Sequence, residues 1–164
     1  MKPALWMVFV LAMATLIQGA QAADCRQVRE LARKTPNFSH PTDGPIISQF
    51  GSRLHPLLGV PRQHNGLDYG AALGAPVRAA EAGIVEIAGP GGYLGNVVII
   101  RHGDEEYETV YGRLGEITVK PHDCVLKGEL IGRVGRTGLS DGTHLHFEIR
   151  RALDPSPLLQ LPGQ

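Results

Sequence analysis

The sequence has no excess of either charge. Its 164 residues include 16 basic and 16 acidic side chains, which gives a formal net charge of zero. Nucleic-acid-binding domains carry a clustered basic surface, and this balance argues against one. We therefore expect no nucleic-acid partner, and no partner attracted by bulk charge.

A long apolar run is found at the N-terminus, from Ala4 to Ile17. It follows the basic Lys2 and precedes Ala20-Gln21-Ala22, which has the small-x-small form of a signal-peptidase site. The run is short for a membrane span. We predict that residues 1–22 are a cleaved secretory signal, with an uncleaved anchor or a lipoprotein as the less favoured alternatives. The mature protein then has no membrane span and is periplasmic or secreted.

Cysteine is scarce: the chain has two, Cys25 and Cys124, and they form no Cys-x-x-Cys pair. In an exported chain two distant cysteines favour a structural disulfide, here tying the N-terminal segment to the domain. A nucleophile pair of Cys124 and His122 is the weaker alternative.

Helical patterns are also scarce. Asp24 can cap a short helix that runs through Val28 and Leu31 and ends before Pro36. From Pro41 onward glycine and proline divide the chain into short segments rich in Val and Ile, which is typical of an all-β fold. Strands are expected near residues 46–50, 66–69, 76–79, 83–88, 96–102, 107–113, 116–119, 130–134 and 143–149.

Apolar and polar residues alternate from Thr143 to Arg150. Successive side chains of a strand point to opposite faces, so one face would carry Thr143, Leu145, Phe147 and Ile149 and the other His144, His146, Glu148 and Arg150. A strand anchored by its apolar face would hold the two imidazoles rigidly, as a metal or acid-base site requires.

A second pair of potential ligands, His64 and Asp68, stands four residues apart around Gly66. Two histidines and one carboxylate leave the fourth position of tetrahedral zinc open, as in catalytic sites. Zinc there would lower the pKa of a bound water and polarise a carbonyl, which suits amide hydrolysis. Spacing alone does not decide which of His144 and His146 is the ligand.

Several short motifs follow one another in a characteristic order. They are Phe50-Gly51-Ser52-Arg53-Leu54-His55-Pro56, His64-Asn65-Gly66-Leu67-Asp68, Gly74-Ala75-Pro76-Val77, Ala82-Gly83-Ile84-Val85, Gly95-Asn96-Val97-Val98-Ile99-Ile100, Lys127-Gly128, Ile131-Gly132, Val134-Gly135, Thr137-Gly138 and Gly142-Thr143-His144-Leu145-His146-Phe147-Glu148. In order and spacing they resemble the LytM-type, lysostaphin-like zinc metallopeptidases of family M23, from about Ile46 to Pro157.

The resemblance implies a compact antiparallel, barrel-like β fold with a groove over the metal, preceded here by a short helix. It implies that His64, Asp68 and His146 bind Zn²⁺, that His144 is catalytic, and that the enzyme hydrolyses peptide cross-links or bridges of bacterial peptidoglycan. The expected organisation is a signal peptide (1–22), an N-terminal helical segment (23–45), the peptidase domain (46–157) and a tail (158–164).

One position departs from the family pattern. Where the family usually reads Tyr-x-His-Leu, this chain has Tyr111-Gly112-Arg113-Leu114. An arginine can donate hydrogen bonds to an oxyanion but, staying protonated, cannot act as a general base. Either Arg113 supplies the electrostatic half of catalysis beside His144, or the protein is a weak or inactive relative that binds or activates another cell-wall hydrolase.

Other candidates carry simpler interpretations. Residues 138–142 fit a Gly-x-Ser-x-Gly nucleophile elbow around Ser140, but the strand-turn-helix context of that elbow is not expected here. Glu148 is either an outer partner of His146 or solvated. His40, His102 and His122 are expected to be solvated rather than ligands, and His55 to be structural.

Overall fold

The structure is a computed structural model that describes residues 25–32, 36–54, 59–103, 106–140, 142–152 and 154–157. These residues form twelve strands, one eight-residue α-helix and one 3₁₀ turn. The all-β prediction is therefore confirmed. The expected signal peptide, the tail and His55 lie outside the described residues, and the expected domain boundaries stay predictions.

A ten-stranded sheet forms most of the molecule, and every strand pair in it is antiparallel. Along its main path the order is β1 (Ile46–Ser48), β4 (Leu67–Tyr69), β11 (Leu145–Arg151), β8 (Tyr107–Ile117), β7 (Asn96–His102), β6 (Gly83–Pro90) and β9 (Cys124–Val125). Off this path, β10 (Leu130–Val134) pairs with β5 (Pro76–Arg78) and β8, and β12 (Asp154–Pro157) pairs with β11.

Strand β8 is longer than the sequence pattern predicted. The expected segments 107–113 and 116–119 are joined into one strand that ends at Ile117. Arg113 lies at the junction with φ of 67°, in the left-handed region that side chains other than glycine rarely adopt. Around this residue the pairing changes: β8 pairs with β11 up to Gly112, with β7 up to Leu114, and with β10 from Leu114 to Ile117.

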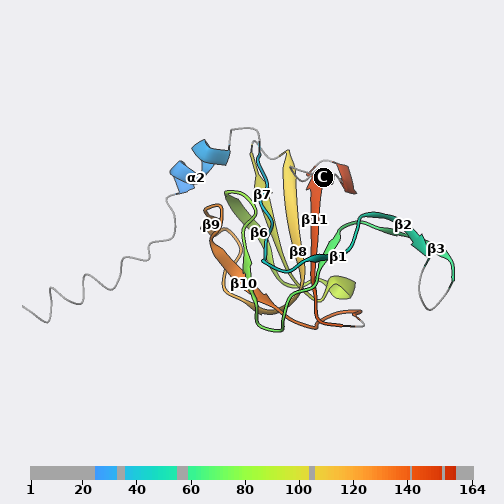
Figure 1. Cartoon of the computed structure of the whole chain (residues 1–164). Helices are drawn as coiled ribbons and strands as arrows, with labels where there is room; N and C mark the ends of the chain where they lie inside the picture. Colours follow the sequence, from blue (N-terminus) through green and yellow to red (C-terminus); the bar gives the residue numbers. More distant parts are fainter. Residues whose placement is uncertain are drawn as a thin grey trace, which may run out of the picture.

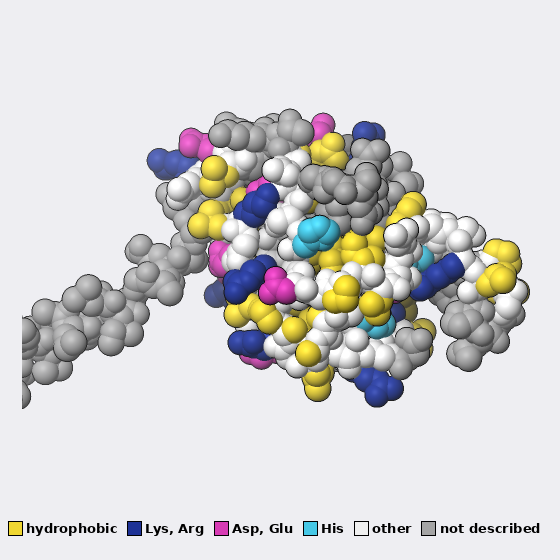
Figure 2. Space-filling view, in the orientation of Figure 1, with side chains coloured by type: hydrophobic (Ala, Val, Ile, Leu, Met, Phe, Trp, Pro, Cys, Tyr) yellow, Lys and Arg dark blue, Asp and Glu magenta, His cyan; other side chains and the backbone are white. Residues whose placement is uncertain are grey.

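A separate two-stranded hairpin was not predicted. It consists of β2 (Gly51–Leu54) and β3 (Pro61–His64), and it projects from the main sheet (Figure 1). Leu54 and Val60 are 68% and 50% exposed, and hydrophobic side chains are visible at the outer end of this hairpin in Figure 2. The hairpin ends at His64, and this connects it to the candidate site.

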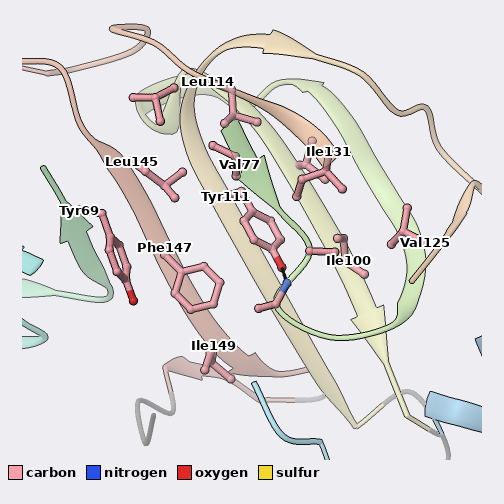
Figure 3. Packing of buried hydrophobic residues seen from close by; sticks show 14 of the residues in the cluster. Tyr69, Val77, Ile100, Tyr111, Leu114, Val125, Ile131, Leu145, Phe147 and Ile149 are labelled. Carbon is pink, nitrogen blue, oxygen red and sulfur yellow. Dashed lines mark hydrogen bonds between the residues drawn. The ribbon is translucent and has the colours of Figure 1, made fainter. Parts of the chain in front are cut away.

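The core packs against the apolar face of β11, as the alternation predicted. Leu145, Phe147 and Ile149 are at most 2% exposed and pack with Tyr111 and Tyr69 (Figure 3). The hydroxyl of Tyr111 accepts a hydrogen bond of 2.8 Å from the backbone N–H of Ala80, drawn as the dashed line. This face holds β11 rigidly and leaves its opposite face for polar residues.

The N-terminal helix α2 (Cys25–Ala32) is tied to the sheet by the predicted disulfide. Cys25 bonds to Cys124 of β9, across 99 positions of the sequence. Val28 is fully buried against Ala82 and Cys124, so the helix packs as well as being bonded. Among the residues that the structure describes, no helix is long and apolar enough to cross a membrane.

Candidate metal centre

Three potential ligands converge where the hairpin meets the sheet. His64 is the last residue of β3, Asp68 is the central residue of β4, and His146 lies on β11 directly opposite Asp68 in the strand register. All three are buried, with exposures of 6–7%. Antiparallel pairing of β4 with β11 places the two side chains on the same face of the sheet.

The donor atoms of these residues lie close together. Asp68 Oδ1 is 2.8 Å from His146 Nδ1 and 3.2 Å from His64 Nε2, and the two nitrogens are 3.3 Å apart. One ligand atom from each residue lies within 4.8 Å of the others. The structure thus brings together the three residues that the resemblance implied as ligands.

In each imidazole the outer nitrogen, the one that points away from the other two potential ligands, faces a hydrogen-bond acceptor. His64 Nδ1 donates to the carbonyl oxygen of Gln49 at 2.8 Å, and His146 Nε2 donates to Glu148 Oε1 at 2.8 Å. Because an acceptor fixes the proton on the outer nitrogen, the lone pair of each neutral ring points inward. Two lone pairs and a carboxylate oxygen that face one another repel unless a positive charge lies among them, so the donor set fits a metal cation.

The same electrostatics shift the pKa values of the cluster. Burial raises the pKa of Asp68, but hydrogen bonds from His146 and His64 outweigh burial and hold that pKa well below its usual range. Burial lowers the pKa of His146, but hydrogen bonds to Asp68 and Glu148 raise it more, so the net shift is upward. The cluster therefore favours a positive charge, which a proton or a metal cation can supply.

Gly66 is needed for this packing. A Cβ atom at this position would lie 2.5 Å from the carbonyl oxygen of Phe147, 2.7 Å from His146 Cε1 and 2.9 Å from Glu148 Cγ. A larger residue would push the His64–Asp68 segment away from β11. The glycine between the two ligands is thus explained by close packing.

His144 lies at the edge of the cluster. Its Nε2 is 3.8 Å from Asp68 Oδ1, and its side chain is 12% exposed. It is therefore close to the ligands but more open to solvent than they are. This position suits proton transfer better than ligation, and the catalytic role of His144 stays a prediction.

Arg113 binds two loops through its guanidinium. Nη1 donates to the carbonyl oxygen of Tyr93, in the 3₁₀ turn Gly92–Leu94, and lies 3.5 Å from that of Thr137. Gly112, its neighbour in β8, is opposite His146 in the register. The backbone of Arg113 is thus next to β11 in the sheet, while its Nη1 contacts the backbone carbonyls of Tyr93 and Thr137.

Arg53 also contacts the cluster, a placement that the sequence pattern did not predict. Its Nη2 lies 3.7 Å from Asp68 Oδ2, and its Nη1 donates to Ser48 Oγ. It comes from the projecting hairpin, whose placement beside the site follows from tertiary structure. The one feature of the sequence that could have pointed to Arg53 is its place in the motif Phe50–Pro56, which resembles that of the family.

The weaker alternatives are excluded by geometry. Cys124 is in a disulfide, so it supplies no thiol nucleophile. Ser140 Oγ donates to the carbonyl oxygen of Gly142 within its own turn, and the next element is strand β11 instead of a helix.

The solvation prediction for three histidines is confirmed for two and wrong for one. His40 and His122 are exposed. His102 is 1% exposed; its Nδ1 donates to the carbonyl oxygen of Ala82 at 2.8 Å, and its Nε2 is 2.7 Å from Thr109 Oγ1. It is buried because these two partners satisfy both ring nitrogens.

Comparison with known proteins agrees with this geometry. Residues 62–156 match the model of peptidase family M23. The chain is 46% identical over 105 residues to the DD-carboxypeptidase/endopeptidase Mpg of Neisseria meningitidis serogroup B, covering 64% of this chain and 24% of that protein. The chain thus spans about a quarter of the length of this curated relative.

Two solved structures share the fold. A zinc-containing peptidase from Vibrio cholerae superimposes with a TM-score of 0.69 at 35% identity, over 77% of this chain and 41% of that one. The catalytic domain of lysostaphin from Staphylococcus simulans gives 0.62 at 30% identity, over 67% of this chain and 82% of that one.

Proposed function

Because the chain belongs to peptidase family M23, we propose that it is a zinc-dependent endopeptidase that hydrolyses peptide cross-links or bridges of bacterial peptidoglycan. The observation that supports this most is the convergence of His64 Nε2, Asp68 Oδ1 and His146 Nδ1, each buried and each facing the others. Two imidazoles and one carboxylate are a donor set of catalytic zinc sites, which keep a position open for water or substrate.

These three residues would hold the ion. Bound there, zinc supplies a Lewis acid that polarises the scissile carbonyl and lowers the pKa of water. The protein contributes the fixed orientation of the ligands, because strands β4 and β11 hold Asp68 and His146 in register and Gln49 holds the His64 ring.

His144 is the proposed proton carrier. Its partial exposure lets Nε2 reach a bound substrate, and the ring lies 3.8 Å from the Asp68 carboxylate at the edge of the cluster. In the proposed mechanism His144 Nε2 accepts a proton from the attacking water and then donates it to the leaving amine nitrogen. General acid-base catalysis of this kind contributes about 10²- to 10⁴-fold.

Arg113 is the proposed electrostatic partner. Its contacts with the carbonyl oxygens of Tyr93 and Thr137 anchor the guanidinium against the segments that carry these two residues. From that anchor it would donate a hydrogen bond to the developing oxyanion, but it would not move a proton. The replacement of the family histidine by Arg113 favours one second candidate: a weak or inactive relative that binds or activates another cell-wall hydrolase.

The disulfide supports an exported protein. Disulfides persist in oxidising compartments such as the periplasm or the external medium. We therefore place the proposed activity outside the cytoplasm, where peptidoglycan is found.

Release of soluble peptide fragments from purified sacculi tests the activity. Zinc-loaded protein should release fragments, a chelator should stop the release, and His144→Ala should lower the rate at least about 100-fold. Sacculi with different cross-links should be compared. If zinc-loaded protein releases nothing from any of them, the peptidase proposal fails and the regulator is favoured.

Arg113→His separates the two candidates. If arginine is part of the mechanism, the variant should be slower than the parent by about 10-fold or more, since one oxyanion donor is worth about 10²- to 10³-fold in other hydrolases. A variant faster than the parent would show that the arginine impairs catalysis. Arg133→His, on an exposed pair with Glu116, is the control.

A further inference from the structure

Strand β11 carries a chain of contacts that begins at the proposed ligand His146 and continues away from the metal centre. His146, Glu148 and Arg150 point to the same face of the strand, since they alternate with the core residues. The Glu148 carboxylate bridges the other two: Oε1 accepts from His146 Nε2 at 2.8 Å, and Oε2 accepts from Arg150 Nε at 2.6 Å.

Glu148 is 1% exposed, so its charge is almost completely removed from water. A buried carboxylate is costly unless hydrogen bonds and opposite charge compensate it. The bonds from His146 and Arg150 supply that compensation, one to each carboxylate oxygen. Gly66 lies directly over the Glu148 side chain, so Glu148 is enclosed on that side as well.

Arg150 holds the outer end of this chain. Its side chain is 18% exposed, so it reaches from the buried carboxylate toward solvent. Glu108 lies opposite Arg150 in the register of β8 and β11. Arg150 thus connects a completely buried carboxylate to polar residues at the surface.

We propose that the Glu148–Arg150 pair positions His146 for metal binding and sets how tightly the metal is held. The inference rests on the proposed zinc site. Glu148 fixes the proton of His146 on Nε2, which leaves Nδ1 free to bind, and its negative charge makes the ring a stronger donor. Arg150 occupies the second oxygen of Glu148 and so fixes the orientation in which the carboxylate faces His146 Nε2.

The two histidines differ in how this control is exerted. The outer nitrogen of His64 faces a backbone carbonyl, which fixes the tautomer without adding a charge. The outer nitrogen of His146 faces a carboxylate, which fixes the tautomer and also adds a negative charge. Metal affinity should therefore respond to substitutions of Glu148 and Arg150.

Zinc affinity, measured by competition with a chromophoric chelator, tests the inference. Glu148→Ala should weaken zinc binding about 10- to 100-fold, the range for partners of metal-ligating histidines. Glu148→Gln should have a smaller effect, because the amide oxygen still accepts from Nε2 but carries no charge. Arg150→Met should fall between the parent and Glu148→Ala. Glu116→Gln, an exposed member of an ion pair with Arg133, is the matched control and should bind zinc like the parent.

A spectroscopic measurement separates positioning from general damage to the fold. In ¹⁵N spectra of the zinc-loaded parent, His146 should carry its proton on Nε2 and bind through Nδ1; Glu148→Ala should show a mixture of bound forms. If Glu148→Ala does not fold, the isosteric Glu148→Gln decides the question. Affinities within twofold of the parent for Glu148→Gln and Arg150→Met, with the His146 tautomer unchanged, would overturn the inference.

These measurements do not depend on peptide hydrolysis. A parent protein that binds zinc with the expected variant series but releases no peptides contradicts the proposed function and supports this inference. A parent that releases peptides while the variants hold zinc unchanged contradicts the inference alone.

Discussion

His146 and His102 are both buried histidines, on strands that flank β8 on either side, yet their surroundings give them opposite properties. His146 faces two carboxylates, Asp68 and Glu148, and its pKa is raised. His102 faces a carbonyl and a hydroxyl, and burial lowers its pKa to about 4. Burial alone therefore does not make a histidine a candidate ligand; the charge of its partners does.

The largest expected difference between the two is in metal binding. His146→Ala removes one of three inward donors and should weaken zinc binding more than about 100-fold, beyond the range for a lost outer partner. Peptide release should be lost with it. His102→Gln should leave zinc affinity within about twofold of the parent. Equal zinc affinities of the two variants in chelator competition would remove the distinction.

Lowering the pH should affect the stability of the protein through His102, whereas the previous prediction concerned metal binding through His146. Unfolded His102 takes up a proton near its ordinary pKa of about 6.5, whereas folded His102 does so only near pH 4. The contribution of His102 to stability is complete above pH 6.5 and is lost as the pH falls toward 4, by about 3 kcal/mol. Urea unfolding across this range should show a smaller loss in His102→Gln than in the parent.

The exposed His122 provides the control for that measurement. His122→Gln should lose stability with falling pH as the parent does. If His102→Gln and the parent gave parallel curves, the buried, neutral state of His102 would be disproved.

Each histidine also packs against a glycine, and this gives the smallest and most selective prediction. A Cβ at Gly66 would lie 2.7 Å from His146 Cε1, and a Cβ at Gly83 would lie 2.8 Å from His102 Nδ1. Either alanine substitution should cost about 1–3 kcal/mol of unfolding free energy through overpacking. Gly66→Ala alone should also weaken zinc binding, as calorimetry with and without zinc would show. Loss of zinc affinity in Gly83→Ala would contradict this.

Sequence periodicity was sufficient to predict strand β11 and its two faces. The alternation from Thr143 to Arg150 predicted which residues face the core, and β11 has that arrangement because its apolar face packs on Tyr111 and Tyr69. His64 and Asp68 were recognisable by their motif. Their distance from His146 was not predictable from spacing, because it depends on the pairing of β4 with β11.

Other features follow from contacts between distant segments. The hairpin β2–β3 has exposed, mixed side chains, so it carries no clear alternation. The sequence predicted two strands, near 107–113 and 116–119, but pairing with β10 continues β8 through the left-handed Arg113. His102 looked like a strand-end residue open to solvent, and its burial depends on Ala82 and Thr109.

The separation of Asp68 and His146 by 78 positions has a consequence for biogenesis. The segment with His64 and Asp68 precedes β11 by many residues in the chain, and β4 has β11 as a neighbour in the finished sheet. A polypeptide therefore lacks the third donor until β11 has paired with β4. Binding of the proposed ion would report that this pairing is complete, and a polypeptide that ends before β11 would not hold the ion.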